Sequence, residues 1–256
     1  MAPTYRPRSS AATARAAELS DIFVRLPYDL GLKAPDELHP PFCATLSTLQ
    51  DVRFMKHLRI YLENGTRWVF ASALDWPGWS RRGKGDEAAV DVLLEYADRY
   101  AKAVGVRVPT GSVDVVGRVA TRSGLADFGA PGALGPWDDQ PLTRREVDRQ
   151  LGLLEASWAY LDEVAAASPS RLRKGPRGGG RDRDAMLSHV REAERAYASK
   201  VGARVPPRTP WAEQRPMILA GLRSPQPGSA WPVRYAIRRL AWHVLDHAWE
   251  MEDRSR

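Results

Sequence analysis

Three of the five histidines in the chain, His189, His243 and His247, lie in its C-terminal half. His243 and His247 are four residues apart, so on a helix they lie one turn apart on the same face and can share an ion. With His189 they would supply three neutral nitrogen ligands, the protein's share of an open catalytic zinc site. Two half-buried, hydrogen-bonded imidazoles would also explain the pair at this spacing, and both interpretations stay open.

Glu250 follows His247 by three residues and continues the same helical face. A carboxylate at this place could orient a liganding imidazole, join the metal or accept a proton. The alternative is an exposed residue close to a frayed C-terminus. Glu250 is therefore the candidate catalytic residue, with its role among these alternatives left open.

Helices must position these side chains, and the chain after residue 142 has helical periodicity. Thr143 and Glu146 form a capping-box pattern ahead of an apolar face that ends at Ser168-Pro169. Three more helices are predicted, from Asp182 or Asp184 to Gly202, from Trp211 to Leu222, and from Pro232 to the end of the chain. Four helices in 142–256 predict an all-α four-helix bundle, with His189 on the second helix and the pair on the fourth.

The N-terminal half has a pattern of short strands and turns in place of long helical periods. Leu58–Leu62, the turn dipeptide Asn64-Gly65 and Trp68–Leu74 predict a β-hairpin with a tight turn. Asp86 can begin a helix, and 113–119 reads as a strand that returns to the sheet. The fold expected here is α+β, a small antiparallel sheet backed by a helix. Trp76 and Trp79 flank a Pro-Gly turn and could stack a ligand or form a packed corner.

Composition divides the chain into four parts. Residues 1–36 are predicted to be a flexible basic tail and lead-in, and 37–123 the α+β domain. The glycine- and proline-rich segment 124–141 is the predicted linker, and 142–256 the bundle. The tail has no apolar stretch that would make a secretory signal, and the mean hydropathy of −0.42 argues against a membrane span.

The C-terminal pattern carries a family resemblance. Ser188-His189-Val190 on the second helix, with Trp242-His243 to His247-Ala-Trp-Glu250 on the last, resembles the DinB-like metal-binding bundle. That family includes the mycothiol- and bacillithiol-dependent enzymes. The resemblance covers 142–256 and implies that the three histidines hold a divalent metal, zinc or nickel. Where many members look to have Gln, this chain has Glu250.

The N-terminal pattern from Tyr61 to Trp79, with Gly83 and a helix opening at Asp86-Glu87-Ala88, resembles the HicB-like domain, a partial ribonuclease H fold. The resemblance implies an antitoxin or partner-binding module without nuclease carboxylates. Local hydrogen bonding and the helix dipole explain Asp75, Asp86 and Glu87, as turn and helix-start residues, better than a nuclease site does.

A basic, glycine-rich run leads into the helix that bears His189. Between residues 171 and 183 it contains six basic residues and one acid. Backbone amides at glycines, a helix N-terminus and guanidinium groups attract anions, so we expect an anion-binding or substrate-binding lip. Its members are Arg173, Lys174, Arg177 and Arg181. A plain solvated loop is the alternative reading, and no Walker pattern closes the run.

The only cysteine, Cys43, excludes an internal disulfide framework and indicates a reducing compartment, so a cytoplasmic location is expected. Since Cys43 lies in the other half, a thiol nucleophile would most simply come from a small-molecule cosubstrate. A divalent ion held by neutral imidazoles can deprotonate a bound thiol. The expected function is a metal-dependent, thiol-dependent transferase or isomerase whose partners are a low-molecular-weight thiol and an electrophile, with a homodimer left open.

A non-enzymatic binding protein is the alternative function. In it, the HicB-like half docks a partner or nucleic acid, and the bundle is a support. A net charge of +7 and a pI near 9.7 favour nucleic-acid binding. Most of the excess positive charge, however, lies in the tail and in the run at 171–183. The domains could also shape one pocket between them, so that neither acts alone.

Overall fold

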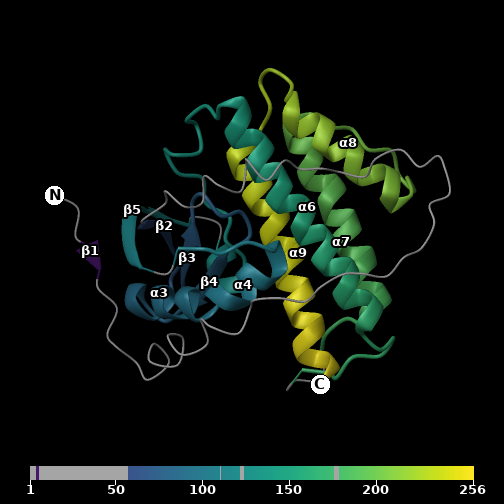
Figure 1. Ribbon diagram of the computed structural model, residues 1–256, viewed down its shortest axis with the longest axis horizontal. Helices are drawn as coiled ribbons and strands as arrows, with labels where there is room; N and C mark the ends of the chain where they lie inside the picture. Colours follow the sequence, from purple (N-terminus) through teal and green to yellow (C-terminus); the bar gives the residue numbers. More distant parts are fainter. Residues whose placement is uncertain (1–3, 6–56, 110, 122–123, 176–178) are drawn as a thin grey trace, which may run out of the picture.

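The computed structural model describes residues 4–5, 57–109, 111–121, 124–175 and 179–256 (Figure 1). Most of the predicted tail and lead-in, Cys43 and Arg177 lie outside these described residues. An α+β part comes first and a mostly helical region follows, as the sequence predicts. Among the described residues, no helix has both the length and the apolar character that crossing a bilayer requires.

Among the described residues, the sheet has five strands in the order β1-β5-β2-β3-β4. The strands are β1 (Thr4–Tyr5), β2 (His57–Asn64), β3 (Val69–Ala73), β4 (Ser80–Gly83) and β5 (Ser112–Ala120). β2 and β3 form the predicted antiparallel hairpin, with Ile60 opposite Ala73 and Asn64 opposite Val69. Four residues, 65–68, connect them, so the tight two-residue turn was wrong. The carboxylate of Asp127 fixes this longer turn by accepting from three of its backbone N–H groups.

The sheet is mixed, so the prediction of an antiparallel sheet was wrong. The predicted strand at 113–119 is present as β5, but it runs parallel to β2. Between β4 and β5 the chain passes through the helices α3 (Asp86–Glu95) and α4 (Ala97–Val104). A crossover through helices brings the chain back in the same direction, which makes the returning strand parallel to its neighbour.

Trp76 and Trp79 form a packed corner between the sheet and these helices. Each is 1% exposed. The indole Nε1 of Trp79 donates to the carbonyl of Leu93 at 2.8 Å, and Tyr100 stacks on the Trp79 ring at a centroid distance of 5.3 Å. The Tyr100 hydroxyl donates to the carbonyl of Pro77 at 2.9 Å. Burial of two indoles with a satisfied donor explains this turn without a ligand.

The segment 124–141 makes specific contacts with both parts of the chain. It contains the short helix α5 (Leu125–Phe128). The N–H of Gly132 donates to the buried carboxylate of Glu63 at 2.8 Å, and the hydroxyl of Tyr235 donates to the carbonyl of Gly132 at 3.0 Å. Asp138 forms a buried ion pair with Arg238, with both side chains under a tenth exposed. These contacts join the sheet to the last helix through the segment.

The C-terminal region contains four helices at the predicted places, and a 3-10 turn, η2 (Ser199–Val201), follows the second. They are α6 (Arg144–Ala167), α7 (Arg183–Ala198), α8 (Trp211–Arg223) and α9 (Val233–Ser255). The capping box is confirmed, because Thr143 Oγ1 accepts from the Glu146 N–H while the Glu146 carboxylate accepts from the Thr143 N–H at 2.8 Å. Such reciprocal bonds satisfy two donors that a helix start leaves without partners.

α9 is the central element of the molecule (Figure 1). It packs along α6 and against α7, and its other side meets the α+β part. Arg81 of β4 lies over the rings of Tyr96 and Trp249, and it bonds to Asp246 of α9 at 2.9 Å. One hydrophobic core runs from the sheet through α9 to α6 and α7. The same helix therefore supports both parts of the chain.

Candidate metal centre

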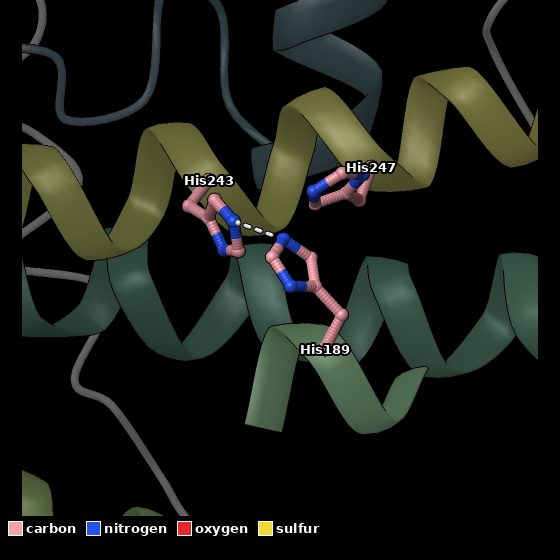
Figure 2. Close-up of side chains that lie close together, drawn as sticks. All are labelled: His189, His243 and His247. Atoms are coloured by element: carbon pink, nitrogen blue, oxygen red, sulfur yellow. Dashed lines mark hydrogen bonds between the residues drawn. The ribbon is translucent and has the colours of Figure 1, made fainter. Parts of the chain in front are cut away.

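The three candidate ligands meet between α7 and α9. His189 projects from α7, and His243 and His247 project from successive turns of α9 toward it (Figure 2). The two helices run antiparallel, because Gly180, just before α7, lies beside Arg254 near the end of α9, while Tyr197 near the end of α7 contacts Arg239. The four-residue spacing and the helix order thus bring the three imidazoles together.

One ring nitrogen from each histidine lies within 4.8 Å of the other two. The Nε2 atoms of His189 and His243 are 3.2 Å apart. Two nitrogens bound to one tetrahedral zinc at about 2.0–2.1 Å would be about 3.3–3.4 Å apart. The His189–His243 separation therefore suits shared coordination.

Burial favours the neutral, metal-binding form of His243 and of His189. His243 is 6% exposed, and burial lowers its pKa to about 2, with further contributions from His247 and His189. Burial also lowers the pKa of His189, as does the charge of Arg181. A neutral imidazole has a lone pair for a cation, whereas a protonated one has none. The Nδ1 atom of the buried His243 has no hydrogen-bond partner among the described residues.

Glu250 contacts a candidate ligand directly. Its Oε2 atom lies 3.0 Å from Nδ1 of His247, and its Oε1 atom accepts from Arg254 at 2.7 Å. The hydrogen bond with His247 is the largest of the effects that hold the pKa of Glu250 below its usual value. An ionised carboxylate on Nδ1 leaves Nε2 of His247 as the free ligand atom, the arrangement by which carboxylates orient metal-binding imidazoles.

The basic run at 171–183 divides into bonded and unbonded cations. The Arg173 guanidinium donates to the carbonyl of Asp253, and Lys174 pairs with Asp182 at 2.7 Å. Arg177 lies outside the described residues. Arg181 is exposed and forms no hydrogen bond or ion pair with any residue in the described ranges. Since its charge lowers the pKa values of His189 and His243, Arg181 lies within electrostatic range of the centre.

Arg239 and Tyr197 adjoin the centre on the opposite side, and the sequence analysis did not single them out for chemistry. The Tyr197 ring stands edge-on to His243 at a centroid distance of 5.6 Å. Arg239 donates to the Tyr197 hydroxyl at 3.3 Å and lies over the rings of Tyr197 and Trp242. Arg239 precedes His243 by four residues, so extending the His243/His247 spacing backward would have found it.

Two acids at turns of the N-terminal half, Asp75 and Asp86, have structural partners. Asp75 accepts two hydrogen bonds from Arg59, at 2.7 and 2.8 Å. Asp86 accepts from Asn64 and from Arg118. Both acids hold strands and turns together, as their places in the sequence suggest. A small cavity between the sheet and α9 is lined by Tyr61, Trp79, Pro131, Tyr235, Arg238 and Trp242, among others.

Comparison with known proteins identifies no relative: no protein-family model, curated protein or solved structure matches the chain.

Proposed function

We propose that this protein is a divalent-metal-dependent enzyme of the DinB-like type, in which α6–α9 form the metal-binding four-helix bundle. His189, His243 and His247 would hold zinc or nickel. The observation that carries the proposal is the approach of three ring nitrogens to within 4.8 Å of one another from two helices. A structural pair of histidines would need neither the third ring nor a carboxylate on His247.

Three neutral imidazole nitrogens add no charge of their own, so a divalent ion bound by them would keep its full charge of +2. A divalent ion bound by neutral imidazoles lowers the pKa of bound water or of a bound thiol. The residues around it would have separate roles. Burial keeps His243 neutral, and Glu250 fixes the tautomer of His247 by accepting from its Nδ1. The unbonded cation Arg181 would attract an anionic ligand toward the centre.

In the proposed reaction, a low-molecular-weight thiol attacks an electrophilic substrate. The enzyme would then be either a transferase that joins the two or an isomerase that uses the thiol as a cosubstrate. None of the described residues is a cysteine, so the thiol would come from a cosubstrate. The basic lip of Arg173, Lys174, Arg177 and Arg181 stays a proposal for anion binding. In the described structure Arg173 and Lys174 already have internal partners, which leaves Arg181 as its best-placed member.

The HicB-like half would serve this site as a support for α9. Nucleic-acid binding is the weaker candidate, because many basic side chains are engaged internally. Arg234 and Arg238 are 6% and 5% exposed, and Arg59, Arg99 and Arg215 form ion pairs. A protein that binds nucleic acid needs its cations on the surface to displace counterions from phosphates.

Metal analysis of the purified full-length protein tests the proposal. We expect about one zinc or nickel per chain after loading, and a rise in the melting temperature when metal is added. Replacing all three ligands with alanine should abolish both effects. His57→Ala is the matched control, because His57 is exposed on β2 and bonds to Ser112. Wild-type protein that binds no stoichiometric metal would contradict the proposed function.

A further inference from the structure

Arg239 occupies a place in the row of polar residues on α9 that faces α7. Arg239, His243, His247 and Glu250 recur at spacings of four, four and three residues, which puts them on one face of the helix. The candidate metal ligands lie in the middle of this row. Arg239 therefore marks the end of the site opposite Glu250 and the basic run.

The contacts of Arg239 hold its guanidinium without a direct ion pair to any described carboxylate. It donates to the carbonyl of Pro131 and to the Tyr197 hydroxyl, and both acceptors are uncharged. No described carboxylate forms an ion pair with it, whereas Arg234, Arg238 and Arg254 of the same helix each pair with an acid. Glu63 is within range of its charge, but the Glu63 carboxylate accepts from the N–H of Gly132. Two bonds use only part of a guanidinium's five N–H donors.

The surroundings of Arg239 connect it to the metal centre. The guanidinium carbon lies 4.7 Å from the Trp242 ring centroid and 5.2 Å from that of Tyr197. Tyr197 in turn contacts His243 edge-on. Aromatic walls restrict water around a cation, and this strengthens its attraction for an anion. The Arg239 charge also adds to the lowering of the His243 pKa.

We propose that Arg239, with the hydroxyl of Tyr197, binds a carboxylate of the substrate, so that the thiol accepted at the three-histidine centre is an acidic thiol. This inference rests on the proposed function and names its substrate class. A guanidinium offers parallel N–H donors that match a carboxylate. The carbonyl of Pro131 orients the donors, so the segment 124–141 positions a specificity residue for a site on α9.

Two thiols, one with a free carboxylate and one in which that carboxylate is esterified, test the inference on the full-length protein loaded with cobalt(II). 3-Mercaptopropionate carries a carboxylate, and its methyl ester does not. Thiolate ligation of cobalt gives a charge-transfer absorption that reports binding directly. We expect the wild-type protein to bind the acid at least about tenfold more tightly than the ester, the effect typical of a hydrogen-bonded charge.

Arg239→Gln should remove this preference while the cobalt stoichiometry stays the same. Arg239→Lys, which keeps the charge without the planar donors, should retain part of it. Arg215→Gln is the matched control, because Arg215 pairs with Asp162 away from the histidines, and it should behave as wild type. The acid and ester comparison in the wild-type protein needs no variant and keeps the test valid if a variant fails to fold.

The outcomes separate the inference from the proposed function. If the cobalt-loaded protein binds the acid and the ester with equal affinity, the inference is overturned and the metal site stays in place. The same holds if the preference for the acid survives Arg239→Gln. Wild-type protein that binds no cobalt, or binds cobalt but neither thiol, overturns the proposed function and the inference together.

Discussion

Glu250 and His247 form a hydrogen-bonded pair one turn from the end of α9, with 3.0 Å between Oε2 of Glu250 and Nδ1 of His247. Arg254 bonds to the other oxygen of Glu250 and donates through Nε to the carbonyl of Arg173. A candidate metal ligand is thus connected through a carboxylate and a guanidinium to the basic run before α7. The contact at Arg173 and the orientation of the imidazole therefore involve the same two side chains.

Glu250→Ala should weaken zinc binding by roughly 10- to 100-fold, because removal of the carboxylate frees the orientation and tautomer of His247. Isothermal titration of the metal-free protein with zinc measures the change. Glu252→Ala is the control. Glu252 lies two residues after Glu250 on α9, and it pairs with Arg99 of α4. Equal zinc affinity for Glu250→Ala and wild type would show that the contact has no role in metal binding.

The metal-free protein should lose stability as the pH falls. Burial lowers the pKa of His243 to about 2, whereas an unfolded histidine titrates near 6.5. Below pH 6.5 the unfolded chain takes up a proton that the folded protein excludes. Between about pH 7.5 and about pH 5.5, this residue should lower the free energy of unfolding by about 1.4 kcal/mol.

Urea unfolding in the presence of a chelator measures this pH dependence. His243→Gln, which cannot take up the proton in either state, should show a smaller loss over the same interval. The pKa of His189 is also lowered, so a residual slope is expected in the variant. A variant that keeps the full wild-type pH dependence would contradict the assignment.

Gly78→Ala should destabilise the protein by roughly 1–3 kcal/mol. Gly78 has a φ of +94°, and an added Cβ would lie 2.7 Å from Cδ1 of Leu245 and 3.1 Å from the backbone of Ala241. Both contacts are on α9, so the substitution would push the corner at Trp76 and Trp79 away from that helix. Thermal unfolding measures the effect.

The control for Gly78→Ala is Gly152→Ala on the exposed side of α6. Nothing lies within 4 Å of a Cβ at Gly152, and alanine favours a helix by up to about 1 kcal/mol relative to glycine. The two substitutions should therefore change stability in opposite directions. Destabilisation by both to the same extent would contradict the close approach of the corner to α9.

The helices and the three-histidine cluster were predictable because their signals are local. The Thr143–Glu146 capping box and the apolar period after it identify the start and buried face of α6. The spacing of His243 and His247 predicts a shared face on any helix. Only the meeting with His189 depended on tertiary structure, because His189 lies 54 residues before His243 and reaches it through the packing of α7 on α9.

The direction of β5 and the role of 124–141 depend on contacts between distant residues. A strand pattern does not specify its direction, which follows from the crossover through α3 and α4. Glycines and prolines in 124–141 indicate turns, but the pairing of Asp138 with Arg238 lies beyond any local pattern. For the same reason the sequence could not show which cations of the basic run have partners, as Arg173 and Lys174 do, and which, such as Arg181, have none among the described residues.

α9 makes contacts on two opposite sides, so the helical region cannot be separated from the sheet without loss of contacts. One side presents candidate ligands to α7, and the other contacts Arg81 and the turn at Gly78. A fragment made only of the helices would expose Trp249 and leave the Arg238 cation without the anchoring network that now surrounds it. Grafting the histidine site onto another scaffold would therefore require the sheet as well, although no strand supplies a candidate ligand.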